Sequence, residues 1–426
     1  MTTSITSRSA SGTTGKILVL TGTTPGTGGV GNLLMRDCCE AIGRENLHYC
    51  AVVTEREKSE ATNCEWVDQC LVRKYETGYR PLSGTVGNVI SHTAFRLMCG
   101  RLARSAARTI AQHVPRRELR LIWAVLDSPA TILMARQISN RLKLPMISFV
   151  MDASEQVSQM YYHDSLTTRF LRRESDAILR SSLACGVAGE TMKERYESLY
   201  GIPCEILRQG AVNAEDELRS PAVKDPARLL IGFAGTITAP DALAAFRKAL
   251  DTVGWRLNGR SVVLRLVGSR CEMRASVPQH VEYFGWRSRT ETAALLAECD
   301  LLYLPQPFSE LHRPFAELSF PNKLMSYLPS CQPIFFHVPR HASLVSFLKS
   351  YAVGTACLTL DSAGIIQVLD AMAQNPDLAS KAATESRRAI AEELNASTLT
   401  RNVRQLLGFE VTDVEKGILQ PLAAGR

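Results

Sequence analysis

The sequence predicts an α/β protein with two doubly wound halves, each a parallel sheet covered by helices, which face each other across a cleft. Short apolar segments alternate with amphipathic segments of helical length from end to end, as in chains of βαβ units. A polar, acidic, proline-containing stretch at 213–226 interrupts this alternation, and a new strand opens at Arg228. A glycine-containing loop follows the first expected strand of each half.

The 426 residues are enough for two domains of ordinary size. The expected organisation is a disordered lead at 1–15, a first Rossmann-like domain at 16–212, a linker at 213–226, a second Rossmann-like domain at 227–385, and helices and a tail at 386–426 that pack back toward the first domain.

Each expected element is a short apolar run for a strand or an amphipathic run of helical period for a helix. The first half has strands at 16–20, 48–53, 119–126, 145–151, 183–188 and 204–207, with helices at 32–42, 129–142, 166–182 and 190–200. The second half has strands at 228–233, 262–267, 281–284, 300–304, 333–337 and 354–357. The tail is helical, with Ser397 as the cap before Leu399, Val403, Leu406 and Leu407.

Composition favours a globular protein, with 45% hydrophobic and 21% charged residues. No apolar run reaches the ~18 residues of a membrane span, and the Ser/Thr/Gly-rich start has no signal-peptide core. The 12 cysteines contain no CxxC pair, so they are expected to be reduced thiols of a cytoplasmic protein. No Asp-x-Asp follows a strand and no zinc spacing is present, so no metal ion is expected.

The net charge is +7, with a basic segment between Arg96 and Arg120. Arg101, Arg104 and Arg108 share one helical face by their spacing. Two interpretations stay open: a solvated helix face, or a patch for an anionic acceptor or for anionic lipid at the inner face of the membrane. Nucleic acid is not an expected partner.

The segment 317–339 predicts an anion-binding site. Pro321 fits the first turn of a helix, Ser319 can cap it, and Ile334 to His337 reads as the next buried strand. The helix start would carry Asn322 and Lys323 at the loop edge of a parallel sheet, where free N–H groups and an ammonium favour an anion. The alternative is an ordinary sheet-covering helix with a solvated lysine.

This segment resembles the Phe-Pro-x-Lys-Leu-x-Glu-Tyr-Leu-x-x-Gly-x-Pro-Ile motif of retaining, nucleotide-sugar-dependent glycosyltransferases of the GT-B fold. Ser326 stands where that family has a ribose-binding glutamate, and Cys331 and Gln332 lie where it has glycine. The matching residues are Phe320, Pro321, Lys323, Leu324, Tyr327, Leu328, Pro333 and Ile334.

The resemblance implies a donor site in the second half. Gly235 and Thr236 lie on the loop that meets the donor diphosphate in that family, and Trp286 follows a strand where the family holds the base. The Arg and Lys that follow this loop in the family are absent, and Arg270 is the nearest replacement. The alternatives are an exposed loop arginine for Arg270 and simple packing for Trp286.

The loop of the first half contains the pattern G-x-G-x-x-G, which includes Gly28 and Gly29. Thr21 to Pro25 separate this pattern from the first strand, whereas the first glycine of a dinucleotide fingerprint follows its strand directly. The loop resembles the glycine-rich loop of GT-B N-domains, and a plain flexible turn is the alternative. Asp152 follows the strand ending Phe-Val-Met, where it can bind acceptor hydroxyls or cap the next turn.

The sequence therefore predicts a retaining, metal-independent glycosyltransferase that uses a nucleoside diphosphate sugar and no cofactor. Lys323, Arg270 and Asp152 would act in catalysis. The first alternative is a catalytically weak or inactive nucleotide-sugar-binding partner of another transferase, and the second is an NAD-dependent Rossmann enzyme. The expected donor-binding residues are Gly28, Gly29, Gly235, Thr236, Trp286, Phe320, Pro321, Asn322 and Ser326.

Overall fold

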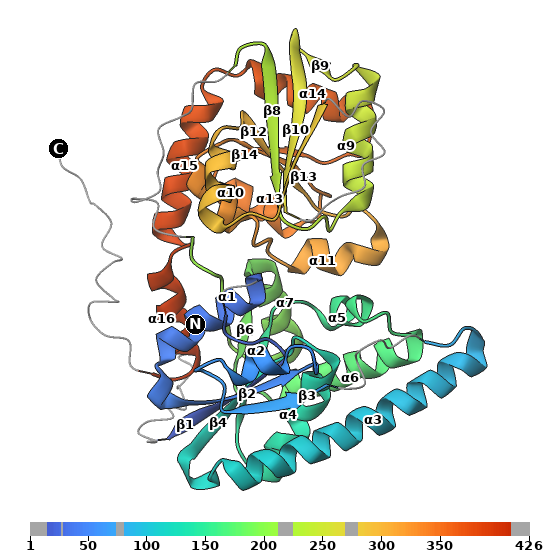
Figure 1. Ribbon diagram of the computed structural model, residues 1–426, viewed down its shortest axis with the longest axis vertical. Coiled ribbons are helices and arrows are strands. Elements are labelled where there is room, and N and C mark those ends of the chain that lie inside the picture. Colours follow the sequence, from blue (N-terminus) through green and yellow to red (C-terminus); the bar gives the residue numbers. More distant parts are fainter. Residues whose placement is uncertain (1–14, 27–28, 74–80, 212–224, 269–279, 410–426) are drawn as a thin grey trace, which may run out of the picture. The chain divides into compact units, whose positions relative to one another are not determined.

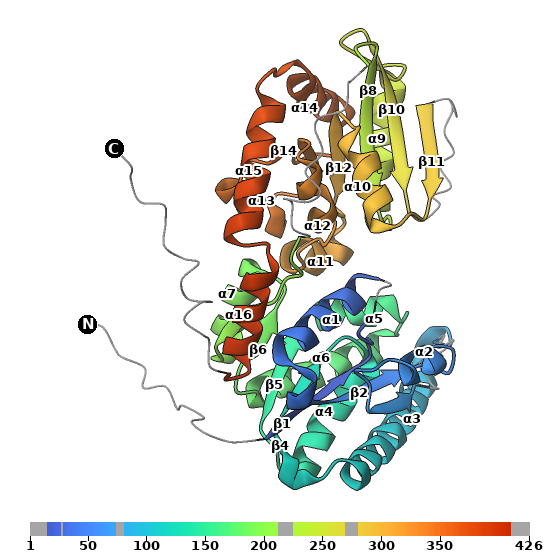
Figure 2. The ribbon, with the colours of Figure 1, turned by 60° about the vertical axis from the view of Figure 1, so that its left-hand side comes forward.

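The computed structural model describes residues 15–26, 29–73, 81–211, 225–268 and 280–409, which form two compact α/β units (Figures 1 and 2). Unit 1 takes its described residues from 15–188, 193–207 and 400–409, and unit 2 from 189–192 and 208–399. Each unit has its own parallel sheet, which confirms the predicted fold class.

The sheet of unit 1 has the strand order β3-β2-β1-β4-β5-β6-β7, and its neighbouring strands all run parallel. The central strand β1 is an apolar run because both of its faces are covered, and Ile17 lies between Leu47 and Leu121 of the adjacent strands. The strands are β1 (Lys16–Thr21), β2 (Leu47–Val53), β3 (Gln69–Val72), β4 (Leu119–Val125), β5 (Met146–Val150), β6 (Cys185–Val187) and β7 (Cys204–Ile206).

Capping residues define where two helices of unit 1 begin. Ser128 and Thr131 form a reciprocal cap, with Pro129 at the first helical position, and the Asp164 carboxylate accepts from the N–H groups of Leu166 and Thr167. The helices are α1 (Val30–Ile42), α2 (Lys58–Thr62), α3 (Gly84–His113), α4 (Pro129–Leu142), α5 (Ser154–Met160), α6 (Ser165–Ser181), α7 (Glu190–Tyr200) and α16 (Ala396–Leu406).

The sheet of unit 2 has the order β11-β10-β8-β12-β13-β14, all parallel, with the short β9 antiparallel to β10. The strands are β8 (Arg228–Ala234), β9 (Arg256–Leu257), β10 (Arg260–Val267), β11 (Val281–Gly285), β12 (Leu301–Pro305), β13 (Ile334–His337) and β14 (Gly354–Cys357).

Aromatic side chains form the centre of the core of unit 2. Phe246 stacks on Tyr303 at 4.3 Å between ring centroids, Phe335 lies 5.9 Å from Phe246, and Trp255 is buried in the same core. The helices of unit 2 are α9 (Pro240–Thr252), α10 (Arg289–Ala297), α11 (Arg313–Leu318), α12 (Leu324–Tyr327), α13 (Ser343–Ser350), α14 (Ser362–Gln374) and α15 (Leu378–Glu392).

The C-terminal region differs from expectation at two points. Residue 385, the expected boundary, falls within α15, and the chain leaves unit 2 only after Leu399, inside α16. The cap of α16 is Asn395, whose side chain accepts from the N–H of Thr398 at 2.8 Å, so the prediction of Ser397 as cap was wrong. No helix in the described ranges has both the length and the apolar character needed to cross a bilayer.

Candidate functional site: the carboxyl edge of the unit 2 sheet

The strand order of unit 2 creates a topological switch point at the carboxyl ends of β8 and β12. The chain leaves β8 toward β10 and β11 on one side, and returns to β12, β13 and β14 on the other. The loops that follow β8 and β12 therefore diverge, and open α/β sheets bind ligands where this happens.

Tyr327 fixes the segment 321–327 at this switch point. Its buried hydroxyl accepts from the Ala234 N–H at the end of β8 and donates to the Tyr303 carbonyl of β12, both at 3.0 Å. Leu324 and Leu328 are fully buried beside it, as the predicted apolar stripe requires. A single side chain thus bridges the two strands that define the switch point and holds the turn that carries Lys323.

Lys323 lies against the loop after β8. A Cβ built on Gly235 would be 3.4 Å from Lys323 Cε and 3.8 Å from Nζ, and Nζ lies 5.5 Å from the centre of the Phe233 ring. Burial of the ammonium lowers the pKa of Lys323 to about 8. No carboxylate is recorded within ion-pair distance of Lys323 among the described residues. A partly buried cation without a counter-ion at a switch point is suited to an anionic ligand.

Three glycines with positive φ lie at the carboxyl ends of the neighbouring strands β8, β10 and β11. Gly235 has φ +100°, Gly268 has φ +116° and Gly285 has φ +65°. The Gly235 N–H donates to Val267, and the Gly268 N–H donates to Gly285 at 2.7 Å. A Cβ on Gly268 would lie only 3.1 Å from backbone atoms of Gly235, so the two loops pack with no room for a side chain.

Phe320 acts as a packing residue of the same segment. It is 7% exposed, its ring meets Phe347 edge-on at 5.5 Å, and the Arg208 guanidinium lies 3.6 Å from its centre. Arg208 in turn pairs with Glu190 at 2.5 Å and with Glu393. We therefore expect Phe320 to anchor the Pro321–Lys323 turn rather than to contact a ligand.

The predicted helix at this segment is shorter than expected. Ser319 is the C-terminal cap of α11, not the N-terminal cap of the next helix, and residues 321–323 form a turn before the single turn of α12. Leu324 N–H bonds back to Pro321, whereas the N–H groups of Asn322 and Lys323 have no recorded backbone acceptor in the described part of the chain. The free donors beside Lys323 thus come from this turn, because the first N–H groups of a turn have no carbonyl one turn earlier to accept them.

The other expected donor residues have varied environments. Trp286, directly after β11, is 80% exposed, so its indole face is open to solvent, and Thr236 is exposed on the loop after β8. Pro321, Asn322 and Ser326, which are near Lys323 in the sequence, are half-buried. Arg270 and Gly28 lie outside the described residues.

Gln306 is a site residue that sequence reasoning missed. It directly follows β12 and is 1% exposed, yet neither Nε2 nor Oε1 has a hydrogen-bond partner in the described structure. Its backbone N–H donates to His337 at 2.9 Å. A buried amide without a hydrogen-bond partner costs free energy, so Gln306 offers a donor and an acceptor to a ligand at this switch point. A lone glutamine in a Pro-Gln-Pro sequence gives no signal of this kind.

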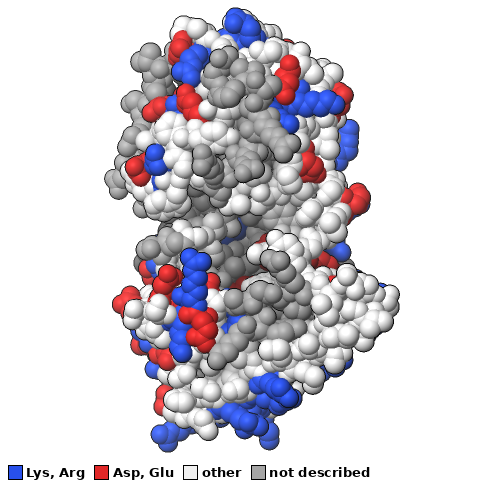
Figure 3. Space-filling view, turned by 45° about the vertical axis from the view of Figure 1, so that its right-hand side comes forward, with Lys and Arg blue, Asp and Glu red and all other residues white. Residues whose placement is uncertain are grey.

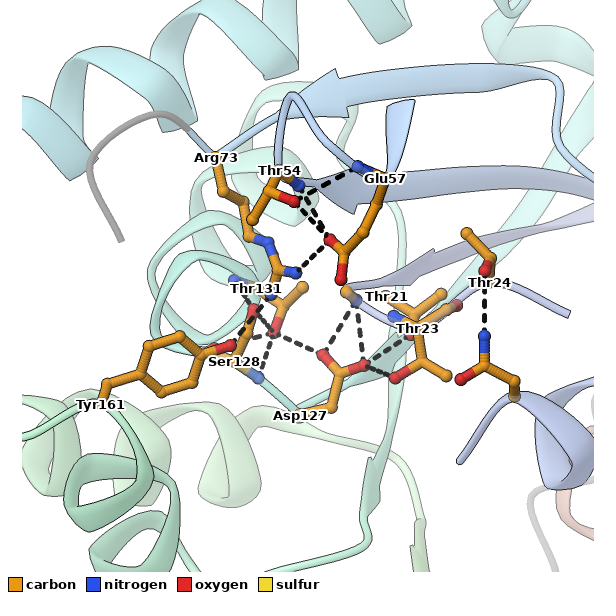
Figure 4. A network of polar contacts seen from close by, with 12 residues as sticks. Thr21, Thr23, Thr24, Thr54, Glu57, Arg73, Asp127, Ser128, Thr131 and Tyr161 are labelled. Carbon is orange, nitrogen blue, oxygen red and sulfur yellow. Dashed lines mark hydrogen bonds and ion pairs between the residues drawn. The ribbon is translucent and has the colours of Figure 1, made fainter. Parts of the chain in front are cut away.

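The carboxyl edge of the unit 1 sheet carries a second polar network (Figure 4). Asp127, two residues beyond β4, accepts from Thr21 at 2.8 Å, from the Gly22 N–H at 2.9 Å and from Thr23 at 2.7 Å. Because β1 and β4 flank the switch point of this sheet, Asp127 ties the start of the glycine-rich loop to the neighbouring strand. The described parts of this loop are held by hydrogen bonds, and Asp127 was not singled out from the sequence.

Arg73 extends this network after β3. It is 6% exposed, and its guanidinium donates to the Tyr161 hydroxyl at 3.1 Å and to Glu57 at 3.3 Å.

Strand β1 ends at Thr21, so four residues separate it from Gly26, one fewer than the sequence suggested. Gly29 has φ +82° and precedes α1, and Asp152 lies two residues beyond β5, where Ala153 rather than Asp152 occupies the cap position of α5.

No family model matches this sequence, and no curated protein does. Solved structures do match. Sucrose-phosphate synthase from Thermosynechococcus elongatus has a TM-score of 0.66 and 11% identity, covering 92% of this chain and 98% of that chain. Anabaena HepE in complex with UDP and glucose has a TM-score of 0.62 and 11% identity, covering 92% and 99%. The trehalose 6-phosphate synthase from Burkholderia multivorans has a TM-score of 0.63 and 13% identity, covering 97% and 100%.

These likenesses extend over both units, although the sequence identities are low. They agree with the two parallel sheets of this chain. The chain has the GT-B fold of glycosyltransferases.

Proposed function

We propose that this protein is a glycosyltransferase that moves a sugar from a nucleoside diphosphate sugar to a glycan, lipid or small-molecule acceptor, with retention and without a metal ion. The observation that carries the proposal is Lys323, a partly buried ammonium held at the switch point of the unit 2 sheet by Tyr327. The fold it shares with HepE, whose structure contains UDP and glucose, supports this proposal.

In the proposed reaction the bond between the anomeric carbon and the diphosphate oxygen breaks through an oxocarbenium-like transition state. Negative charge builds on the departing diphosphate, and Lys323 stabilises it together with the N–H groups of Asn322 and Lys323. The departing phosphate oxygen takes the acceptor proton, so no side-chain base is required. His337 fits this view, because burial lowers its pKa to about 4 and both ring nitrogens are within hydrogen-bond distance of Tyr303 and Thr359.

The remaining residues would position the donor. Gly235 lets the backbone beside Lys323 come close to a diphosphate, and Gly268 lets the next loop pack against Gly235. The Thr236 hydroxyl can donate to the diphosphate, and the exposed Trp286 offers a stacking face for the base. Ser326 would bond a ribose hydroxyl more weakly than a carboxylate does. Arg270 and Gly28 stay proposals from the sequence, and Asp152 stays one for binding acceptor hydroxyls at the edge of the unit 1 sheet.

The two alternatives make different predictions. Ser326 in place of glutamate favours a partner protein that binds a nucleotide sugar without turning it over. The NAD-dependent alternative is disfavoured by Asp127, because its carboxylate takes the Gly22 N–H and lies at the switch point where a pyrophosphate would bind in unit 1.

Calorimetry with UDP, GDP and NAD(H), followed by hydrolysis assays with UDP-, GDP- and dTDP-sugars, tests the proposal. We expect binding of a nucleoside diphosphate, no binding of NAD(H), and slow donor hydrolysis. Binding without any turnover would favour the inactive partner. Micromolar NAD(H) binding that Gly29→Ala abolishes, without nucleoside diphosphate binding, would overturn the transferase.

Nucleoside diphosphate affinity is expected to fall as the pH rises through about 8. The free protein has a lowered Lys323 pKa of about 8, and a bound diphosphate favours the ammonium and raises that pKa. Below pH 8 the proton is already present, whereas above it binding must take up a proton, which weakens affinity by up to about tenfold per pH unit. Calorimetry in two buffers of different ionisation enthalpy measures the uptake.

The control for this pH dependence is Lys323→Arg, which keeps its charge throughout this range. It should show no proton uptake on binding between pH 7.5 and 9.5. An equal pH dependence in this variant and the parent would assign the effect to another group.

Gly268→Ala is expected to weaken nucleoside diphosphate binding by about tenfold or more and to destabilise unit 2. The new Cβ would be strained at φ +116° and would press on backbone atoms of Gly235, which cannot rotate away. The matched control is Gly259→Ala, because Gly259 has φ +76° but nothing within 4 Å of its Cβ. Urea unfolding should show that both variants are destabilised by strain. Only Gly268→Ala should also lose affinity for the nucleoside diphosphate. Equal affinities of the two variants would show that these loops do not contact the ligand.

A further inference from the structure

Helix α3 presents an apolar stripe to solvent along its N-terminal half. Val86 is 73% exposed, Ile90 54% and Leu97 57%, and the spacing of i, i+4 and i+11 places them on one side of the helix. Val89 and Met98 flank this stripe at 49% and 43% exposure. Exposed apolar side chains are common singly, but a stripe of this length on one helix face indicates a binding surface.

The same face becomes basic in the C-terminal half of α3. At about 100° per residue, Arg101, Arg104 and Arg108 continue the line of Val86 and Leu97 within about a quarter of the circumference. All three are exposed, and none has a recorded ion pair or hydrogen bond with a described residue. The 30 residues of α3 contain no aspartate or glutamate at all.

The opposite face of α3 anchors the helix to unit 1. Its buried residues pack against α4 and α6, and in Figure 1 the N-terminal end of α3 extends beyond both. In Figure 3, Lys and Arg side chains gather along the lower edge of the view. The buried residues of this face are Ser91, Phe95, Cys99, Ala103, Ala106, Ala107 and Ile110.

We propose that this face of α3, defined by Val86, Ile90, Leu97, Arg101, Arg104 and Arg108, docks on the surface of a bilayer that contains anionic phospholipid. The apolar half is about 16 Å long and the basic half about 10 Å, so both contact one plane when the helix lies flat. Apolar side chains then enter the boundary between headgroups and acyl chains, while the arginines meet lipid phosphates.

A second copy of the chain fits this face poorly. In an antiparallel pair of α3 helices the arginines would oppose the partner's apolar stripe, and in a parallel pair they would oppose each other. Either arrangement buries guanidinium groups without a counter-charge. A bilayer surface instead offers apolar and anionic layers together. The proposal does not depend on glycosyl transfer, because lipid binding is measured without turnover.

The test is cosedimentation of the full chain with vesicles of phosphatidylcholine alone and of phosphatidylcholine with 30% phosphatidylglycerol. We expect binding to the anionic vesicles that weakens with salt, and little binding to the neutral ones. Since each basic residue near an anionic surface strengthens binding about fivefold, Arg101→Gln, Arg104→Gln and Arg108→Gln combined should lower the partition coefficient on the order of 100-fold. Val86→Ser, Ile90→Ser and Leu97→Ser combined should lower it at least tenfold.

A charge-matched control removes three exposed cations of unit 2, with Arg256→Gln, Lys349→Gln and Lys381→Gln combined. This control should bind the vesicles as the parent does. An equal loss of binding in the control would show that net charge alone, and not the α3 face, causes the effect.

A Leu97→Trp variant should gain tryptophan emission that brominated acyl chains quench. Binding to vesicles without this quenching would contradict the insertion of the apolar side chains. Light scattering without lipid should give the same mass for parent and variants. A dimer lost in the α3 variants would assign the face to self-association and overturn the proposal.

Discussion

Lys323→Ala is expected to lower turnover by roughly 100- to 1000-fold, the effect of removing one preorganised donor to a developing anion. The loss should appear in the turnover number, because charge on the leaving diphosphate is greatest in the transition state. Lys323→Arg should recover only part of the rate, since a planar guanidinium and a point charge meet phosphate differently. The measurement is turnover of the donor sugar that the hydrolysis screen identifies.

The same variant should keep or gain thermal stability. A lysine pKa lowered to about 8 means that burial of the ammonium costs free energy below pH 8. That cost disappears as the pH rises from about 8 toward the unfolded value of about 10.4, because the folded protein then releases the proton first. The melting advantage of Lys323→Ala should therefore be larger at pH 7 than at pH 9.5. Full turnover with an unchanged nucleotide-induced rise in melting temperature would show that Lys323 does not contact the donor.

Arg208→Met is expected to destabilise unit 2 by about 2–4 kcal/mol at pH 7.5. Arg208 is 7% exposed between Glu190 and Glu393, and its removal leaves two carboxylates facing each other. The value stays below that of fully buried pairs because the Glu190 side chain is half-exposed. The loss should be smaller at pH 5.5, as burial and Glu190 already raise the Glu393 pKa and the variant can protonate it.

Arg313→Met is the matched control, because Arg313 also lies between two carboxylates, Glu310 at 3.5 Å and Glu317 at 3.6 Å, but is half-exposed. It should cost less than about 1 kcal/mol. Urea unfolding of both variants at the two pH values measures the difference. Arg208→Met combined with Glu190→Leu and Glu393→Leu should regain much of the loss. Equal stability of the two single variants would show that burial adds nothing to the Arg208 ion pairs.

Local sequence patterns predicted most of the elements of this fold. The bounds of the helix Pro129–Leu142 and the strand Ile334–His337 match, because a proline start and a short apolar run leave few alternatives. Strand β3, Gln69–Val72, was missed because its four residues, one polar and three apolar, are too few to show a clear period. The helix expected from Pro321 was predicted too long, since α12 begins only at Leu324 and the turn at 321–323 precedes it.

The candidate site was predicted only where one segment carries its chemistry. Lys323 and Gly235 were found from local motifs, whereas Tyr327 acts through Ala234 and Tyr303, 93 and 24 residues away. Asp127 was not singled out, because its carboxylate bonds to residues 104 to 106 positions earlier in the chain. Pairings of this kind depend on strand order, which a single sequence does not display.

The interleaved course of the chain has a consequence for protein synthesis. Unit 1 needs residues from Thr400 onward, including Asn402 bonded to Ile206 and Leu407 bonded to Arg120, yet residues 208–399 are translated in between. At ~5–20 residues per second the ribosome takes about 10–40 s over that stretch. Unit 2 can therefore complete its sheet on the nascent chain before unit 1 receives its last helical segment, so unit 1 is the later of the two to gain all of its residues.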